Sequence, residues 1–414
     1  MVSVHVHQES ATLSVAEATR SLALAAGLRS RRGRSDLENA MAALVGGAAI
    51  AVASGRGAIA LALRLSGLAA PADEVIVTGY TCVAVPAGVL AGGGRPRYAD
   101  VDPGTGNMSP ATVAMQMTER TGAVVVQHLL GNPAPTRAIR DASRPGIWIV
   151  EDAAHALGSR VGDDLVGQHG DWAIYSTEQS KSLSTGQGGI LVAVSDRARE
   201  RLETFAGSGR TWSRSRTRRW LIRIGAERLA FGFVPAGRPQ PGQILVRLLH
   251  RSGLASVSSR DEAELAGGMP AWRLAMLPDQ LAEIGVRQLA RLDAILDHRR
   301  SVAARYEQTL DGIGQRLAVE PDARPVWLRY PVLVDDADSV GPAMRERGWS
   351  LGGRWFGTPI YPSDADPLRV GYVPGSCPQA ERLAGRMLNL PTHPLVSERL
   401  ADRLAADLRR VLGA

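Results

Sequence analysis

The stretch that decides the fold is a short apolar run that ends abruptly in acidic residues, Ile147-Trp148-Ile149-Val150-Glu151-Asp152-Ala153-Ala154-His155. Four consecutive apolar residues bounded by polar ones predict a short buried strand. An acid at the carboxyl end of such a strand is typical of the ligand crevice of an open α/β sheet. We therefore expect Asp152 to face a ligand.

Strand-like and helix-like segments alternate around this stretch. Strands are predicted at 75–77, 97–101, 123–127 and 190–194, and helices at 83–91, after Pro110 and at 136–142. This alternation predicts an α/β fold, with a largely parallel sheet covered by helices on both faces. A chain of 414 residues exceeds the size of one core, so a second, smaller α+β domain is expected. The expected division is an N-terminal arm at 1–40, a large domain at 41–268 and a small domain at 269–414.

A polar loop downstream, residues 175–189, carries one lysine among small hydroxyl and glycine residues. A lysine amine can bond to the aldehyde of pyridoxal phosphate, a carboxylate can keep the pyridine nitrogen protonated, and hydroxyl groups can hold the phosphate. Lys181, Asp152 and Ser176 could fill these roles. Each also has a simpler interpretation, since a loop lysine is usually solvated and an aspartate after a strand often caps a turn.

A second candidate for phosphate binding is Ser54-Gly55-Arg56-Gly57, which precedes an apolar segment. Leucines there alternate as in a strand, but the alanines between them favour a helix, and we predict a helix capped by Ser54. The N–H groups and dipole of such a helix start attract anions. Arg56 and Gly57 would lie nearest the phosphate, although a capped helix without a ligand is the simpler alternative.

Taken together, the order and spacing of these motifs resemble the DegT/DnrJ/EryC1/StrS family of sugar aminotransferases, which are fold type I pyridoxal phosphate enzymes. The resemblance runs from about residue 40 to the C-terminus. Besides the motifs above it rests on Asp73-Glu74-Val75-Ile76-Val77, Tyr80-Thr81, Asp100-Val101-Asp102-Pro103 and Asn389-Leu390-Pro391-Thr392-His393-Pro394.

This resemblance implies a transamination between an amino acid donor such as glutamate and a keto-sugar, typically nucleotide-linked. It implies that Lys181 holds the cofactor and moves the proton, that Asp152 binds the ring nitrogen, and that His155 lies beside the ring hydroxyl. It also implies a homodimer with its two sites at the interface. Alternatives are another lysine-assisted reaction, such as elimination or cyclisation of a small precursor, and a non-catalytic member of the family.

Two positions depart from the family pattern. Cys82 stands where the family usually has an aromatic residue that stacks on the cofactor, so either Tyr80 supplies the ring face or apolar packing alone holds the cofactor. Ala271 stands where the family has an asparagine that reaches the phosphate site of the partner subunit, and alanine carries no amide.

Two further segments carry clusters of arginine. Residues 1–40 are expected to form a solvated arm or a first helix packed on a neighbouring subunit. Residues 209–268 resemble an insertion, with tryptophans at 212 and 220. A solvated excursion near the mouth of the site is the preferred interpretation, and an anion-binding lid or a surface that contacts anionic lipid is the alternative.

The composition of the chain limits the kinds of ligand and the cellular location that can be expected. The net charge of +7 suits anionic cofactors and substrates, and no recognised nucleic-acid-binding motif accompanies it. No Cys/His cluster has the spacing of a metal site. No apolar run is long enough to span a membrane, no signal peptide is evident, and only two cysteines occur. A cytoplasmic protein is therefore expected.

Overall fold

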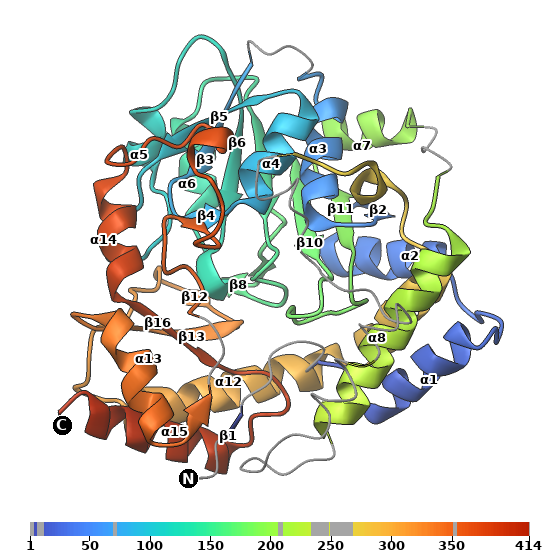
Figure 1. Ribbon diagram of the computed structural model, residues 1–414. Coiled ribbons are helices and arrows are strands. Elements are labelled where there is room, and N and C mark those ends of the chain that lie inside the picture. The colour runs from blue at the N-terminus through green and yellow to red at the C-terminus, as the bar shows by residue number, and fades with distance from the viewer. Residues whose placement is uncertain are drawn as a thin grey trace.

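The computed structural model describes residues 4–5, 12–68, 73–205, 210–232, 248, 268–350 and 354–413. At its centre is a seven-stranded sheet in the order β2-β11-β10-β7-β6-β3-β5 (Figure 1). The strands are β2 (Ala48–Val52), β3 (Glu74–Thr78), β5 (Arg95–Ala99), β6 (Thr121–Gln127), β7 (Trp148–Asp152), β10 (Trp172–Ser176) and β11 (Gly189–Ala193).

Only β11 runs antiparallel to its neighbours β2 and β10, whereas β5, β3, β6, β7 and β10 form a parallel ladder. The mostly parallel α/β sheet predicted from the alternating pattern is therefore confirmed. Strand β3 is buried along its whole length, which explains why its sequence is apolar on both faces. The predicted strands near 75, 97, 123, 147 and 190 are all present.

Helices cover both faces of the sheet. On one face, Ile59 of α3 (Gly55–Leu65) and Val89 of α4 (Ala84–Gly92) pack against Val75 and Val77. On the other, Ile76 packs with Ile139 of α6, and Leu37 and Met41 pack with the β11 side chains Ile190 and Val192. The helices of this second face are α5 (Pro110–Ala114), α6 (Thr136–Ala142), α2 (Arg34–Val45) and α11 (Asp279–Leu289).

The C-terminal part has a core of its own, built from residues between Val302 and Leu408. A two-stranded antiparallel sheet, β13 (Arg329–Leu333) with β16 (Met387–Pro391), is packed by helices. These helices are α12 (Leu292–Thr309), α13 (Ala337–Glu346) and α15 (Glu398–Val411). Helix α14 (Pro378–Arg386) leads into β16. A boundary between the domains at residue 268 stays a prediction.

The helical pattern of apolar residues from Leu281 to Leu310 is carried by two helices instead of one. The chain leaves helical geometry at Arg291, with φ −129° and ψ 21°, between α11 and α12. The Arg291 guanidinium donates to the Glu17 carboxylate at 2.8 and 2.7 Å. This ion pair connects the start of α12 to the N-terminal helix that contains Glu17. Hydrophobic periodicity does not reveal such a contact.

The N-terminal residues form helices instead of a solvated arm. Helix α1 (Val15–Ala25) lies along α8 (Arg214–Gly232) in Figure 1. Ser21 donates a hydrogen bond to the Leu221 carbonyl at 2.8 Å, and Trp220 and Ile224 are buried. The first part of the 209–268 segment is thus packed on this chain, which corrects the solvated interpretation. Residues 233–247 and 249–267 lie outside the described part.

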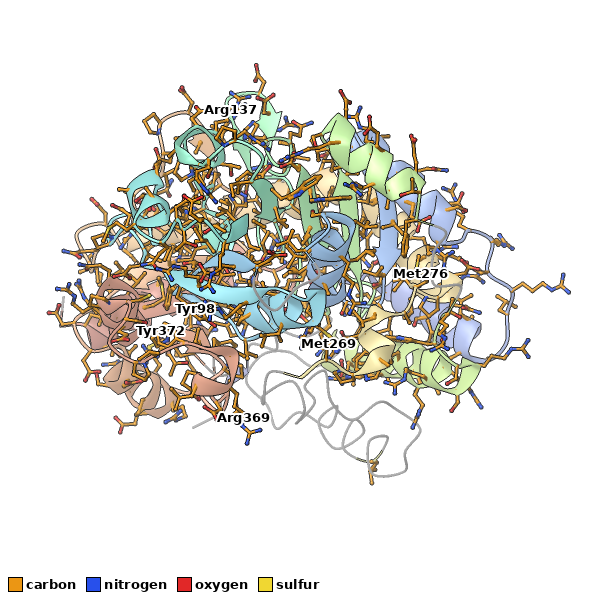
Figure 2. The ribbon with its side chains drawn as sticks, turned by 90° about the horizontal axis from the view of Figure 1, so that it is seen from above. Tyr98, Arg137, Met269, Met276, Arg369 and Tyr372 are labelled. Atoms are coloured by element: carbon orange, nitrogen blue, oxygen red, sulfur yellow. The ribbon has the colours of Figure 1, made fainter. Side chains whose placement is uncertain are left out.

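Shorter elements join the two parts of the chain. In Figure 2, Tyr98 of β5 lies beside Tyr372, with an edge-to-face contact at 5.1 Å between ring centroids. Parallel pairing of β4 (Thr81–Cys82) with β15 (Ile360–Tyr361) makes a second connection. The remaining short strands are β1 (Val4–His5), β8 (Arg160–Val161), β9 (Asp164–Leu165), β12 (Ala323–Arg324) and β14 (Trp349–Ser350), and α7 (Asp196–Glu203) completes the helices of the large part. Across the described residues, no helix is long and apolar enough to cross a membrane.

Candidate active site

The site is built at the carboxyl edge of the parallel strands, where Asp152 ends β7. Its side chain is 5% exposed and accepts a hydrogen bond from the Ala154 N–H at 3.1 Å. Burial raises the pKa of this carboxyl, and the charges of Lys181 and His128 only partly oppose that effect. Within the described residues Asp152 forms no ion pair. A cationic ligand would therefore find a buried anion ready to receive it.

The neighbouring acid, Glu151, has a structural role on the opposite face of the strand. It is fully buried, contacts His128 at 3.2 Å and accepts from the N–H groups of His169 and Gly170, each at 2.6 Å. Burial opposes ionisation of Glu151, yet these hydrogen bonds and the His128 charge lower its pKa. Its hydrogen-bonding capacity is used inside the protein, which leaves Asp152 as the acid of the crevice.

Lys181 lies in the loop after β10, as predicted. Its backbone N–H donates to the Glu178 carbonyl at 3.0 Å, and its carbonyl accepts from the Thr12 hydroxyl at 2.8 Å. The amine Nζ lies 5.3 Å from the centroid of the Trp355 ring. Burial lowers the pKa of this amine, Arg329 lowers it further, and Glu178, Cys82 and Asp152 work in the opposite direction. A lowered pKa increases the fraction of neutral, nucleophilic amine at neutral pH.

His155 is oriented by the backbone. Its Nδ1 accepts from the Leu130 N–H at 3.3 Å, so the proton of the neutral ring resides on Nε2. Leu130 has φ +52°, a left-handed conformation that is uncommon for a leucine and typical of a functional constraint. Burial and the charges of Lys181 and Arg329 hold the pKa of His155 well below its usual value. The imidazole is therefore neutral and presents an N–H donor.

The predicted cap of α3 is present, whereas the phosphate site expected beside it stays a prediction. Ser54 caps α3, since its Oγ accepts from the Gly57 N–H at 3.0 Å and donates to the Arg273 carbonyl at 3.0 Å. The Ser176 side chain lies beside this helix start, where a Cβ on Gly55 would come within 3.3 Å of it. Gly57 itself is buried with its N–H bound by Ser54. Gly55, Arg56 and Ser176 are partly exposed and are better placed to meet a phosphate.

Tyr80 and Cys82, the two residues near the position where the family has a stacking aromatic, differ in their exposure. Tyr80 is fully buried and donates its hydroxyl to the Phe356 carbonyl at 2.7 Å, so it has no ring face to offer a ligand. Cys82 is partly exposed and close enough to Lys181 to influence its pKa. Cys82 therefore lines the site, whereas Tyr80 supports it from behind. Ala271 is exposed at the start of a short 3-10 turn, Ala271–Leu274.

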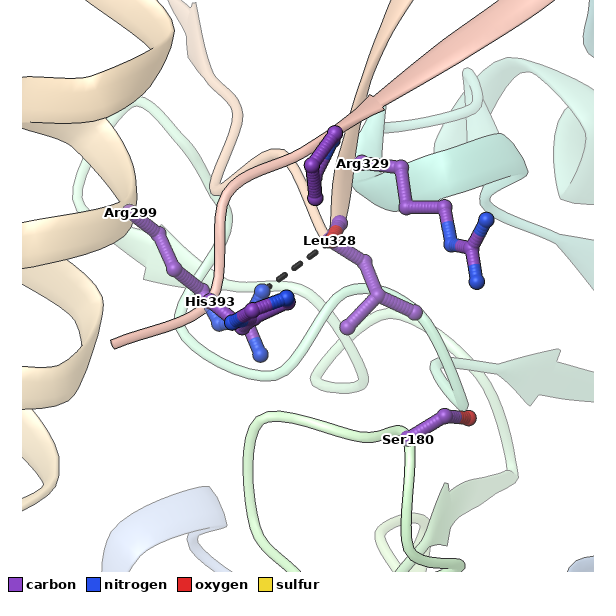
Figure 3. A pocket seen from close by; sticks show the side chains of 6 residues that line it. Ser180, Arg299, Leu328, Arg329 and His393 are labelled. Carbon is purple, nitrogen blue, oxygen red and sulfur yellow. Dashed lines mark hydrogen bonds between the residues drawn. The ribbon is translucent and has the colours of Figure 1, made fainter. Parts of the chain in front are cut away.

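Sequence reasoning missed two residues that close the site from the C-terminal part. The Trp355 ring stacks on His155, with 6.0 Å between centroids and 29° between planes. Arg329 at the start of β13 places its guanidinium carbon 3.4 Å from the centroid of the same ring. Figure 3 shows Arg329 with Ser180, Arg299, Leu328 and His393 around a small pocket. Neither residue belongs to a motif, so only the fold reveals them.

The donor set fits pyridoxal phosphate. Asp152 as a buried anion and His155 as a neutral N–H donor both lie within electrostatic reach of Lys181, and the capped start of α3 lies beside Ser176. A mostly parallel seven-stranded sheet with a separate C-terminal core is the architecture of pyridoxal phosphate enzymes of fold type I.

Comparison with known proteins specifies the family. The sequence model of the DegT/DnrJ/EryC1/StrS aminotransferase family matches residues 8–230 and 245–409. The chain belongs to this family.

Two characterised relatives illustrate its range. The chain is 28% identical to UDP-N-acetyl-3-dehydro-alpha-D-glucosamine 3-aminotransferase of Acidithiobacillus ferrooxidans, over 91% of this chain and 88% of that protein. It is also 28% identical to a pleiotropic regulatory protein of Geobacillus stearothermophilus, over 84% and 81% of the two chains. Among solved structures, DesV of S. venezuelae in complex with a ketimine intermediate matches with a TM-score of 0.70 and 26% identity, over 96% and 95% of the two chains.

Proposed function

We propose that this protein binds pyridoxal 5'-phosphate and transfers an amino group from an amino acid, such as glutamate, to a keto-sugar carried on a nucleotide. The observation that carries the proposal is that buried Asp152, at the carboxyl end of β7, lies within electrostatic reach of Lys181, whose amine has a lowered pKa. The name of the Acidithiobacillus relative, an aminotransferase of a UDP-linked dehydro sugar, supports the choice of acceptor.

Each residue has a defined task in this proposal. When bound, the cofactor supplies an electron sink for the carbon that loses its proton. Asp152 would keep a proton on the ring nitrogen, because an adjacent buried carboxylate favours the cationic form. His155 would donate a hydrogen bond from its Nε2–H to the ring hydroxyl oxygen, and Ser176 with the start of α3 would hold the phosphate.

Lys181 would then act as the general acid and base. Its Nζ would take the proton from the α-carbon of the donor and return it two bonds away, at the cofactor carbon C4′, which requires an amine that is neutral near the working pH. The lowered pKa of Lys181 suits this task. The Trp355 ring contacts both His155 and Lys181, so it would shield one side of the reacting amine from bulk water.

The near-ultraviolet and visible absorption spectrum of the purified protein, before and after addition of glutamate, tests the proposal. A visible band that shifts with glutamate is expected, and Lys181→Ala should abolish transamination while the fold persists. Full turnover by this variant would refute the assigned role. A protein that fails to take up pyridoxal phosphate at all would instead favour a non-catalytic family member.

We also propose a homodimer with its sites at the interface and a cytoplasmic location. The family resemblance supports the dimer, and Cys82 and Cys377, which are both free thiols, are compatible with a reducing compartment. Light scattering at several protein concentrations tests the dimer, and cell fractionation tests the location.

A further inference from the structure

Lys181 is the only lysine in the chain, and the other cationic side chains are arginines and histidines. No other side chain can therefore offer a primary amine to an aldehyde. Whether the protein can bond covalently to its proposed cofactor depends on the protonation state of this one amine, since only a neutral amine is nucleophilic. The groups that control the proton of Lys181 therefore control cofactor binding.

The first of these groups is Glu178, which lies shortly before Lys181 and closes the turn that carries it. The Lys181 N–H donates to the Glu178 carbonyl at 3.0 Å. The carboxylate oxygen Oε2 of Glu178 accepts from the N–H and the hydroxyl of Ser180 at 3.0 and 2.5 Å. Since Ser180 is the residue next to Lys181, these bonds restrain the backbone from which the amine extends.

The charges that act on the amine come from the lysine loop itself and from strands β4, β7 and β13. Burial lowers the pKa of Lys181, and Arg329 at the start of β13 lowers it further. The negative charges that oppose this effect belong to Glu178, Cys82 and Asp152. Glu178 contributes most among them, so the residue that closes the turn is also the main anion that acts on the amine.

Glu178 is also the anion best suited to offset Arg329. Cys82 is negative only when its thiol has lost a proton, and Asp152 is assigned to the ring nitrogen in the proposed function. The His155 imidazole is neutral, because burial and nearby positive charges hold its pKa well below its usual value. Burial lowers the pKa of Arg329 to about 9, so this guanidinium stays charged at neutral pH, and the Glu178 charge acts on it as well. One carboxylate thus offsets both the amine and the guanidinium.

We propose that Glu178 is a positioning residue that controls Lys181, an inference that rests on the proposed function. Its carboxylate, anchored on Ser180, holds the lysine turn and keeps a negative charge within electrostatic reach of the amine and of Arg329. Glu178 thereby sets the pH at which Lys181 changes from an ammonium ion to a nucleophile. A Glu178 with a purely structural role would hold the turn without affecting that pH.

Such a charge matters because Lys181 has two tasks. A general base must be neutral to take a proton and must then return that proton as an acid, which works best when its pKa lies near the working pH. Burial and Arg329 both weaken the amine as a base, whereas Glu178 restores part of its basicity. Glu178 therefore keeps the amine able to carry the proton as well as to release it.

The titration of Lys181 can be followed directly, because a single lysine gives a single side-chain resonance in the NMR spectrum of protein grown with lysine labelled at Cε. The cofactor-free protein is used, and Lys181→Ala identifies the resonance. In Glu178→Gln the amide oxygen can still accept from Ser180 while the charge is lost, so the midpoint should move to lower pH than in the wild type. Uptake of pyridoxal phosphate at neutral pH should become roughly three- to tenfold faster, because more of the amine is neutral. Glu119→Gln is the control, since it removes a carboxylate that is 94% exposed and paired with Arg144, and should change neither quantity.

A second variant separates the charge from the turn. Glu178→Ala removes the charge together with the hydrogen bonds to Ser180, so its midpoint should match that of Glu178→Gln while its uptake of the cofactor should be slower. A midpoint in Glu178→Gln equal to that of the wild type, or the same shift in Glu119→Gln, would overturn the inference. Equally fast uptake by the two Glu178 variants would overturn the role in the turn. A midpoint that falls as expected, in a protein that takes up the cofactor but gives no spectral change with any amino acid, would instead refute the proposed function.

Discussion

Replacing Asp152 with Asn should have opposite effects on the protein without cofactor and on the reaction. The substitution keeps the size and the hydrogen bond from Ala154 but removes a buried charge. Since burial raises the pKa of Asp152 above its ordinary 3.8, the folded state binds the proton more tightly. Wild-type stability therefore falls as pH rises from about 3.8 through the raised pKa. Without cofactor, the variant should be as stable as the wild type at neutral pH, or more stable.

With cofactor the sign reverses. An amide cannot hold the ring nitrogen protonated, and the loss of one partner of a buried ion pair costs about 3–5 kcal/mol. The half-reaction with glutamate should therefore slow on the order of 100- to 5000-fold. Thermal melts with and without pyridoxal phosphate, together with stopped-flow absorbance, measure both effects. Asp163→Asn, at a fully exposed carboxylate, is the control. A variant that melts lower without cofactor yet reacts at the wild-type rate would refute the reasoning.

Three further outcomes follow from individual contacts. Gly57→Ala would place a Cβ 2.3 Å from the Arg273 carbonyl oxygen. The melting temperature should therefore fall by the equivalent of about 1–3 kcal/mol, and the affinity for the cofactor should drop. Gly385→Ala is the control, because open space surrounds Gly385 and the substitution should not destabilise the protein. Burial of Glu283 opposes the ionisation of its carboxyl group, but hydrogen bonds, of which the one from Arg20 is the strongest, lower its pKa to about 2. Glu283→Gln should thus cost about 1–3 kcal/mol at neutral pH in urea titrations, a difference that disappears as pH falls from 4.5 towards 2. The rate at which the protein without cofactor takes up pyridoxal phosphate should rise with pH through a pKa below 10.5, because Lys181 is desolvated; an inflection at 10.5 would contradict this.

The parallel sheet and its ligand edge could be predicted because each strand carries a local signal. The run at 147–150 is apolar on both faces, and its acid falls at the carboxyl end, where open α/β sheets bind ligands. The Ser54 cap was equally local, since capping is decided within four residues. Lys181, Asp152 and Ser176 lie close in sequence to these signals. Their positions followed from the strands that carry them.

Helix boundaries set by distant contacts could not be predicted. The break at Arg291 depends on an ion pair with Glu17, which is 274 residues away in the chain. The packing of α1 on α8 depends on a hydrogen bond between Ser21 and Leu221. Neither contact changes the hydrophobic period that sequence reasoning follows. Tertiary contacts decided both cases.

The same distinction explains which side of the active site the sequence revealed. The cofactor side is built from strand ends and helix starts, where backbone geometry restricts the side chains that fit. The opposite side is built from Trp355 and Arg329, whose guanidinium carbon lies 3.4 Å from the ring centroid, although neither stands in a recognisable motif. A buried arginine in a strand looks like an error of patterning until its neighbours are known. Sequence patterning is commonly violated where function requires it, so the fold was needed to bring Arg329 and Trp355 to the side of His155 and Lys181.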